Sequence, residues 1–307
     1  MAATGWYLLR FLDELEPGLN PVDVGGRALL AIRDGAEVSV YDATCPHRGA
    51  HLGYGGALDR DCVVCPFHGK RISLGGTGRL GVARHHTVQA GAAVFVRLGD
   101  EPAHDRGFEV AMKAVAAQSE LVGATTRRSR VPATYVVENA FDVDHFLAVH
   151  KVPRSSSMTV ELGPAGELHI DGEFRTAMSP WVSAAERERV RRAGPVTFDA
   201  ASRFAAVAYS PHVVITWFGE GPQASPIITG GLPLADGGCE VRVAVGASDP
   251  AVLPHLVAGA QRAITEDLVV WDHLDPTAPQ RFDSRDRAVV AFRQFCTGFP
   301  ALGGATS

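Results

Sequence analysis

Two short motifs hold the residues of this chain that are best suited to redox chemistry. They are Cys45-Pro-His47 and Cys65-Pro-Phe-His68, separated by residues 48–64. Each motif supplies one thiolate and one imidazole from a tight loop. Two such loops facing each other can hold a [2Fe–2S] cluster, with two cysteines on one iron and two histidines on the other. Because neutral imidazoles replace two anionic thiolates, this cluster accepts an electron more readily than an all-cysteine cluster.

A zinc site with two cysteines and two histidines is the alternative for the same four residues. Zinc sites usually pair like ligands, C-x-x-C with H-x-x-x-H, whereas each loop here carries one residue of each type. The flanking sequences Cys-Pro-His-Arg-Gly and Cys-Pro-Phe-His-Gly also fit the two bent loops of a Rieske centre. We therefore predict that Cys45, His47, Cys65 and His68 bind a [2Fe–2S] cluster.

A second group of candidate ligands has the pattern D-x-x-H-x-x-x-x-H, formed by Asp142, His145 and His150 in a helix expected from about 138 to 150. Two histidines and one carboxylate make the facial triad of non-haem Fe(II) oxygenases, which leaves positions open for O2 and substrate. An ideal helix places the two histidines about 140° apart. A shared metal therefore requires a π-bulge or local unwinding near His150. Two unrelated surface histidines are the alternative.

The carboxylate of such a triad is expected on a second helix, from about 253 to 272. Asp267 lies near the middle of its apolar stripe, where an ionised carboxylate is costly unless it is paired or bound to metal. By the same helical arithmetic, Glu266 and Asp272 point away from the stripe and are expected to be solvated. We therefore predict Asp267 as the third ligand. The stripe consists of Leu253, Val257, Ala260, Ile264, Leu268 and Trp271.

The first hundred residues are expected to form a small antiparallel β domain. Residues 22–42 alternate as a strand pair does, around a turn at Asp34-Gly35, and a further strand covers residues 92–97. Residues 101–130 are polar and irregular, with a short helical piece near 110–117. We interpret them as a connection whose basic run, Arg127-Arg128-Ser-Arg130, is a solvated surface.

The rest of the chain alternates between strands and two helices, which predicts an α+β fold with one antiparallel sheet. The predicted domains are residues 1–105, which carry the cluster, a connection at 106–130, and a catalytic mononuclear iron domain at 131–307. Six strands are predicted in the last of these: Thr159–Leu162, Leu168–Arg175, Phe204–Ser210, Val213–Phe218, Ile227–Leu232 and Val241–Val245.

Composition bounds the remaining possibilities. Hydrophobic residues make up 46% of the 307 residues and charged residues 21%, which is ordinary for a globular protein. The formal charge of −5 argues against a broad nucleic-acid-binding surface. Neither a signal peptide nor an apolar run long enough to span a bilayer is recognisable. Cys62, Cys239 and Cys296 are scattered, so we expect free thiols and a reducing, cytoplasmic location.

Together, these motifs resemble the Rieske non-haem iron oxygenases, specifically their terminal oxygenase (alpha) component. The spacings Asn139-x-x-Asp142 and Asp267-x-x-x-Trp271 look most like the steroid 9α-hydroxylase branch. Rieske proteins of respiratory chains carry extra cysteines where this chain has Ala50 and Phe67. The resemblance implies a Rieske domain followed by a helix-grip catalytic domain, a homotrimer, and a cluster that feeds the iron of the neighbouring subunit.

The resemblance also implies roles for individual residues. Asp142 matches the acid that bridges a cluster histidine, here His68, to the iron ligand His145, and Asn139 joins it as a catalytic candidate. Lys70 departs from the pattern, because an aromatic residue commonly follows the His-Gly of the second loop. The chain is also short for the family, which weakens any transfer of the steroid substrate.

The expected reaction is O2-dependent hydroxylation, or a related monooxygenation, of a small organic substrate. Desaturation, oxidative cyclisation and amine N-oxygenation are alternatives at the same iron. No dinucleotide fingerprint is present, so electrons are expected from a separate ferredoxin or NAD(P)H-dependent reductase. A Rieske electron carrier with a non-catalytic appended domain is the alternative class; His145, His150 and Asp267 argue against it, since a carrier needs no open-sited iron.

Overall fold

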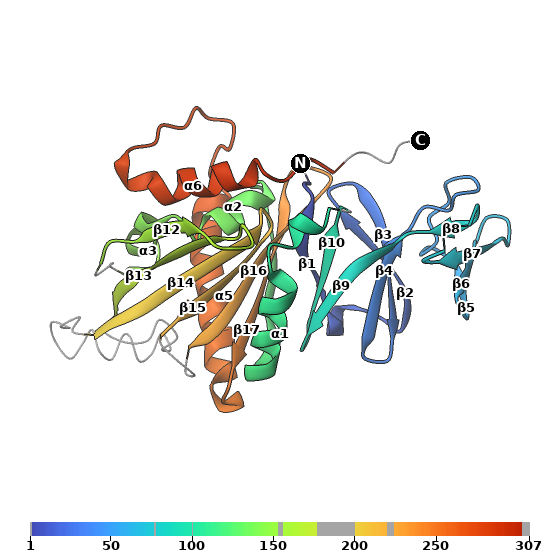
Figure 1. The fold of residues 1–307 in the computed structure, drawn as a ribbon, viewed down its shortest axis with the longest axis horizontal. Coiled ribbons are helices and arrows are strands. Elements are labelled where there is room, and N and C mark those ends of the chain that lie inside the picture. Colours follow the sequence, from blue (N-terminus) through green and yellow to red (C-terminus); the bar gives the residue numbers. More distant parts are fainter. Residues whose placement is uncertain are drawn as a thin grey trace.

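The computed structural model describes residues 2–76, 78–99, 101–152, 156–176, 200–219 and 224–302. Two β-rich halves lie side by side along the long axis of the molecule (Figure 1). The N-terminal half contains two sheets and the C-terminal half one larger sheet with helices on both of its faces. This is the expected α+β arrangement, with an antiparallel β domain followed by a domain built from one antiparallel sheet and helices.

The N-terminal half is built on a six-stranded antiparallel sheet in the order β1-β10-β9-β4-β3-β2. A smaller sheet, β5-β6-β7-β8, projects from it at the far end of the molecule (Figure 1). The predicted turn at Gly35 joins β3 to β4, and Gly35 has a φ of 60°. The strands are β1 Gly5–Phe11, β2 Gly18–Val24, β3 Arg27–Asp34, β4 Glu37–Asp42, β5 Ala57–Asp59, β6 Cys62–Val64, β7 Arg71–Leu74, β8 Gly81–Val82, β9 Arg84–Ala90 and β10 Ala93–Leu98.

The C-terminal half is built on a seven-stranded antiparallel sheet in the order β11-β17-β16-β15-β14-β13-β12. All six strands predicted here are present, with ends that differ by a few residues. They are β12 Thr159–Leu162, β13 Leu168–Thr176, β14 Ala200–Ser210, β15 Val213–Phe218, β16 Ser225–Pro233 and β17 Cys239–Ala247, and β11 is Glu120–Ser129.

Part of the predicted connection belongs to this sheet. Residues 120–129 form β11, which pairs with β17 along its whole length. Leu121 and Ala124 are buried in the cores on opposite faces of the sheet, and Ser129 is buried at the end of the strand. Arg127 and Arg128, the arginines of the basic run that lie in β11, are exposed on this edge strand, where charged side chains are favoured.

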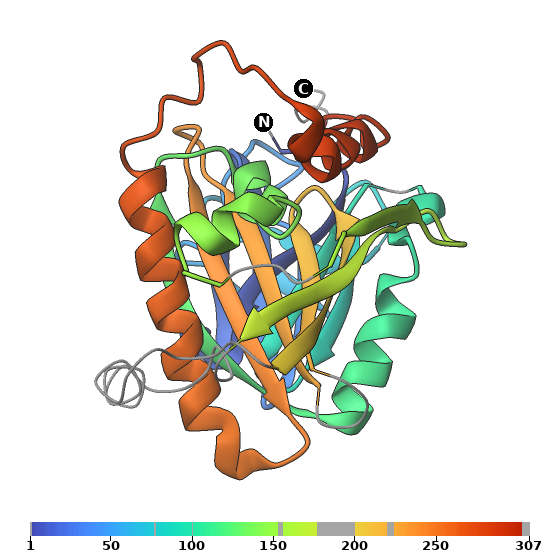
Figure 2. The same cartoon turned by 90° about the vertical axis from the view of Figure 1, so that its left-hand side faces the viewer.

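Helices cover both faces of the large sheet (Figure 2). Alternate residues of a strand point to opposite faces, and Val213 and Ile215 of β15 pack toward α1, whereas Val214 faces the other way. The helices are α1 Phe108–Gln118, α2 Ala133–Glu138, α3 Val143–Ala148, α5 Leu253–Trp271 and α6 Arg287–Cys296. Single turns of 3-10 helix occur at Leu12–Glu14, Pro102–Asp105, Pro250–Val252 and Ser284–Asp286. None of the described helices combines the length and apolar character that a membrane span requires.

The prediction of one continuous helix from 138 to 150 is wrong. Helix α2 ends at Glu138 and helix α3 begins at Val143, so the chain breaks between two short helices. Asp142 explains the break, because its side chain caps α3 by accepting the N–H of His145. Short acidic side chains favour such caps over helix interiors. By contrast, α5 has nearly the predicted limits, and its apolar stripe packs against β11 and β17.

Candidate metal centres

The two cysteine–histidine loops share one backbone geometry although their sequences differ. The first follows β4 and the second follows β6. In each loop the N–H of the cysteine, Cys45 or Cys65, donates to the carbonyl oxygen five residues later at 2.8 Å. The N–H of Gly49 or Gly69 donates back to the cysteine carbonyl at 2.9 Å. Both glycines adopt the left-handed backbone that favours glycine, with φ of 75° and 64°.

The side chains of these loops pair by type. Cys45 and Cys65 are buried with their thiols in contact, whereas His47 and His68 are exposed with ring centroids 4.8 Å apart. Backbone N–H groups two and three residues after each cysteine point at its sulfur and stabilise the thiolate. Sulfur beside sulfur and imidazole beside imidazole is the arrangement that a Rieske cluster needs, with like ligands on each iron.

The four side chains divide into a sulfur pair and an imidazole pair, since the two thiols are in contact and the ring centroids of His47 and His68 are 4.8 Å apart. A [2Fe–2S] cluster with like ligands on each iron requires this division, whereas a tetrahedral zinc site does not.

His145 and His150 converge because the helix that carries His145 ends before His150. Helix α3 stops at Ala148, and Lys151 adopts a left-handed φ of 62°. The two imidazole ring centroids are 5.0 Å apart and their planes meet at 81°. This is the local unwinding near His150 that a shared metal requires.

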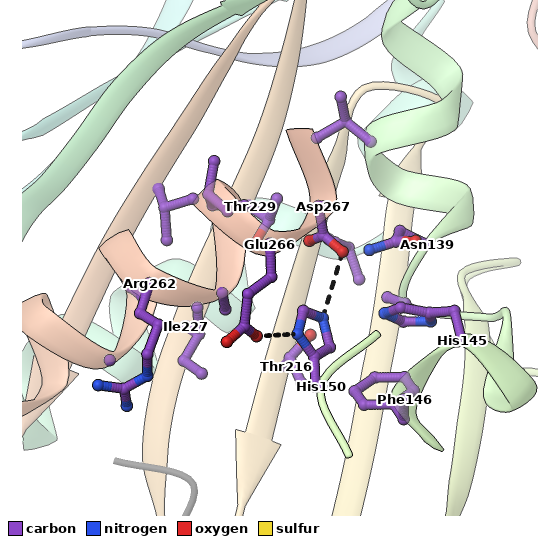
Figure 3. Close-up of a pocket in the computed structure, with 18 of the residues that line it drawn as sticks. Asn139, His145, Phe146, His150, Thr216, Ile227, Thr229, Arg262, Glu266 and Asp267 are labelled. Atoms are coloured by element: carbon purple, nitrogen blue, oxygen red, sulfur yellow. Dashed lines mark hydrogen bonds and ion pairs between the residues drawn. The ribbon is translucent and has the colours of Figure 1, made fainter. Parts of the chain in front are cut away.

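Hydrogen bonds at Nδ1 turn the Nε2 atoms of both histidines toward a common point (Figure 3). Nδ1 of His145 donates to the backbone carbonyl of Asp142, and Nδ1 of His150 donates to Oε2 of Glu266 at 2.8 Å. A carbonyl or carboxylate oxygen can only accept, so both rings carry their proton on Nδ1. Nε2 of His150 then lies 3.2 Å from Oδ1 of Asp267. Two imidazole Nε2 atoms beside a carboxylate form the donor set of a 2-His-1-carboxylate centre.

Burial and charge act in opposite directions at the two imidazoles. Burial lowers the pKa of His145 more than the nearby carboxylate of Asp267 raises it. Burial also acts to lower the pKa of His150, but hydrogen bonds to Asp267 and Glu266 reverse the effect and leave it raised. Asp267 itself is only 5% exposed. The site therefore concentrates negative charge in a buried space that suits a cation.

Glu266 corrects the sequence analysis, which expected it to be solvated. Its carboxylate lies against His150 and lines the same cavity as the triad. The loop that carries His150 passes over the side of α5 next to the predicted stripe, which helical arithmetic on α5 alone could not reveal. Asp272, the other acid considered there, is exposed as expected and accepts the hydroxyl of Ser129 at 3.4 Å.

Asn139 and Asp142 take different positions around the triad. Asn139 follows α2 and lines the cavity beside Asp267 and His145 (Figure 3). Oδ1 of Asp142 accepts the backbone N–H of His145 at 3.3 Å. Oδ2 of Asp142 has no hydrogen-bond partner among the described residues. This half-exposed carboxylate therefore keeps one oxygen available at the outer side of the site.

The triad lies in the wall of a largely apolar cavity of about 130 Å³. The cavity lies between α2, α3, α5 and the face of the large sheet that α5 covers. Its polar groups apart from the triad are few. They are Asn139, Thr216, Thr229, Arg262 and Glu266, set among residues such as Val136, Phe146, Val214, Phe218, Ile227, Val243, Ile264 and Trp271.

The two sites lie at opposite ends of the molecule. The cluster loops adjoin β5 to β8 at one end of the long axis, and α3 lies at the other (Figure 1). Both cluster histidines and Phe67, whose side chain is 58% exposed, are at the surface. The geometry therefore presents the two histidines of these loops outward rather than toward the triad of the same chain.

Comparisons with known proteins agree with this geometry. The model of the Rieske [2Fe-2S] domain matches residues 5–96. Cholesterol 7-desaturase nvd 1 of Ciona intestinalis is 40% identical over 70 residues, which cover 22% of this chain and 15% of that protein. The match to this curated relative thus covers only a small part of its length.

Two solved structures are similar over nearly the whole chain. One is dicamba monooxygenase with non-haem iron and dicamba, with a TM-score of 0.67 and 20% identity over 96% of both chains. The other is NdmB of Pseudomonas putida CBB5, with a TM-score of 0.67 and 18% identity over 95% of this chain and 89% of that one. At these identities the likeness concerns the fold. Residues 5–96 are thus a Rieske [2Fe–2S] domain, and the chain as a whole has the fold of the terminal components of Rieske non-haem iron oxygenases.

Proposed function

We propose that this protein is a terminal oxygenase that uses electrons from a Rieske cluster, held by Cys45, His47, Cys65 and His68, to oxidise a small organic substrate with O2 at a mononuclear Fe(II). The iron ligands are His145, His150 and Asp267. The observation that carries the proposal is the placement of this buried triad in the wall of an apolar cavity. When bound, the iron supplies coordination positions for O2 and substrate, and the cluster supplies electrons one at a time.

The residues of the chain have separate tasks in this proposal. The backbone carbonyl of Asp142 accepts a hydrogen bond from Nδ1 of His145, and the carboxylate of Glu266 accepts one from Nδ1 of His150. These hydrogen bonds keep each Nε2 directed at the metal. Phe146 and Phe218 belong to the cavity wall that excludes water from the reacting atoms. Asn139 reaches the cavity next to Asp267, where its amide is available to a polar group of the substrate.

Electron transfer between subunits follows from the separation of the two sites. A homotrimer in which the exposed cluster histidines of one chain meet the α3 region of the next would bring them together. Oδ2 of Asp142 is available to accept the N–H of His68 of the partner subunit, while Oδ1 contacts the backbone of His145. In this arrangement Asp142 connects the cluster of one chain with the iron site of the next, a connection that the single chain lacks.

The proposal also includes partners and location. A separate ferredoxin or NAD(P)H-dependent reductase supplies the electrons, and the substrate is a small molecule rather than a nucleic acid. A reducing, cytoplasmic location suits the five cysteines, all of which the structure describes and none of which forms a disulfide. The domain limits 1–105, 106–130 and 131–307 are retained, except that β11 is counted with the C-terminal sheet.

The product of a turnover tests the proposal. The protein would be supplied with a surrogate reductase, candidate substrates and oxygen-18 labelled O2, and products would be analysed by mass spectrometry. Incorporation of label indicates hydroxylation or another monooxygenation. A product without label, two hydrogens lighter than the substrate, indicates desaturation or cyclisation. If the cluster is reduced and reoxidised but no substrate is changed across the panel, an electron carrier becomes the better account.

A further inference from the structure

Glu266 reaches His150 from the turn of α5 that also carries Asp267. Its Oε2 lies 2.8 Å from Nδ1 of His150, and Oδ1 of Asp267 lies 3.2 Å from Nε2 of the same ring. Figure 3 shows the imidazole held between the two carboxylates. Adjacent residues of one helix thus contact opposite nitrogens of one imidazole.

The two histidines of the triad are supported differently. Nδ1 of His145 bonds to a backbone carbonyl three residues away, within the cap of its own helix. Nδ1 of His150 bonds to a charged carboxylate on another element. A carboxylate acceptor makes the imidazole a stronger electron donor to a metal than a neutral carbonyl does.

His150 also lacks the local support that His145 has. It lies beyond the end of α3, and the following Lys151 has a left-handed backbone conformation. The backbone around it bonds back to α3 through the N–H of Val152 and the carbonyl of Phe146, at 2.8 Å. These bonds fix the chain but leave the rotation of the imidazole undetermined. The side-chain contacts with α5 determine which nitrogen faces the cavity.

We propose that Glu266 is a positioning residue for the mononuclear metal. By accepting a hydrogen bond from Nδ1, Glu266 holds Nε2 of His150 toward the metal and strengthens His150 as a metal ligand. The same hydrogen bond connects the loop after α3 to α5. This inference rests on the proposed function, because it takes His145, His150 and Asp267 as the metal ligands. Since the Glu266 side chain is also 37% exposed and lines the cavity, contact with substrate is the competing role.

Metal binding separates these roles without a known substrate. The holoprotein would be stripped of its mononuclear metal, with the cluster intact by visible absorption, and titrated anaerobically with Fe(II) and with Co(II) as a spectroscopic probe. The variants are Glu266→Ala, Glu266→Asp and Glu266→Gln. Asp272→Asn is the matched control, because it removes the charge of a nearby acid that does not contact a ligand.

Glu266→Ala is expected to weaken Co(II) and Fe(II) binding about 10–100-fold, the usual effect of losing such a partner. Glu266→Asp keeps the charge but is too short to reach Nδ1, so it should resemble Glu266→Ala. Glu266→Gln keeps an acceptor oxygen but loses the charge, so its affinity should lie between those of Glu266→Ala and the wild type, with a ligand-field spectrum of Co(II) close to that of the wild type. Asp272→Asn should match the wild type in both measurements.

Two results would overturn the inference. One is that Glu266→Ala has the same metal affinity and Co(II) spectrum as Asp272→Asn, whether or not turnover falls. Glu266 would then not position the metal, and any effect on turnover would come from contact with the substrate. The other is Glu266→Gln no better than Glu266→Ala, since a hydrogen-bond acceptor would not be what matters. If the wild type binds Co(II) no better than Asp267→Ala, the proposed metal site itself fails, and that result is distinct from either of these.

Discussion

Nε2 of His150 lies 3.2 Å from Oδ1 of Asp267, although one residue follows the short helix α3 and the other lies in the last part of the long helix α5. An imidazole and a carboxylate this close, both largely buried, are stable only as an ion pair or as ligands of a shared cation. The convergence of His145 on the same space favours the shared cation.

Replacing Asp267 by Ala should remove the mononuclear iron and reduce turnover by about a hundredfold or more, because the site loses its only anionic ligand. The visible absorption of the cluster should persist, since the two sites lie at opposite ends of the chain. Iron analysis and absorption spectra of the purified variant check both statements. Full activity would transfer the ligand role to Glu266 or to another acid.

Replacing Asp142 by Asn should leave both metal centres bound but stop the reduced cluster from supporting product formation. The amide preserves the size and the capping acceptor of α3 but loses the charge and the ability to take up a proton. Rapid-mixing measurements of cluster reoxidation, compared with Asp144→Asn on the same helix, isolate the effect. Equal reoxidation rates in the two variants would leave Asp142 with a structural role alone.

Mixed oligomers test the route between subunits independently. Cys45→Ser lacks an intact cluster and His145→Ala lacks an intact iron site, so each variant alone should be inactive. In the proposed trimer the cluster of one chain faces the iron of another, so co-assembled oligomers should recover part of the activity. Demonstrated subunit mixing without any recovery would exclude the intersubunit route.

Lys70 should raise the reduction potential of the cluster. Partial desolvation lowers the pKa of His47, and the positive charge of Lys70 lowers it further, which places that charge close to a cluster ligand. A nearby cation stabilises the reduced cluster, which carries the extra negative charge. Lys70→Met should therefore lower the midpoint potential by on the order of 10–50 mV. Redox titrations of Lys70→Met and of the control variant Lys113→Met, which changes a residue of α1, check this prediction. Equal midpoint potentials in the two variants would contradict it.

His212 should make the fold less stable in acid. It is 1% exposed, stacks on Tyr7 with ring centroids 4.6 Å apart, and accepts the N–H of Ala3 at Nε2, which requires the neutral ring. Burial lowers its pKa from 6.5 to about 3. Between these pH values the unfolded chain binds the extra proton, so the free energy of unfolding falls as the pH falls, by at most about 1.4 kcal/mol per pH unit.

The variant His212→Gln measures this contribution by difference. Its own stability is expected to be lower at pH 7, because Gln replaces the stacked ring, but it should lose less than the wild type between pH 7 and pH 5. Denaturant midpoints of both proteins at the two pH values give the comparison. Parallel losses would show that His212 does not titrate in this way.

The sequence predicted what depends on local pattern. Strands such as Val213–Phe218 and the long helix that contains Asp267 follow from alternation and from helical spacing, and the structure has them nearly as predicted. The two cysteine–histidine loops were recognisable because their ligands lie within a few residues of each other. Asp267 was recognisable as an acid on an apolar stripe.

What the sequence did not reveal depends on contacts between distant segments. Glu266 gains its role only because the loop after α3 passes over α5, and the spacing on either element does not contain this fact. The break at Asp142 reflects competition between a cap and a continuous helix, and the cap prevailed. The exposed arginines made residues 120–129 look like a surface segment, whereas they form β11. Its partner β17 is far away in the sequence, so local pattern could not predict the pairing. The pairing of Nδ1 of His150 with a carboxylate was nevertheless foreseeable in kind, because metal-binding histidines usually have such a partner.

The central claim is that each chain holds a Rieske cluster and a separate mononuclear iron at His145, His150 and Asp267. Iron analysis combined with EPR of dithionite-reduced, anaerobic protein, before and after nitric oxide is added as a spin probe for open-sited Fe(II), tests it most directly. We predict a Rieske signal together with a high-spin iron–nitrosyl signal in the wild type, and loss of the nitrosyl signal alone in His145→Ala. About one zinc per chain with no Rieske signal, or a nitrosyl signal that survives in His145→Ala, would contradict the account.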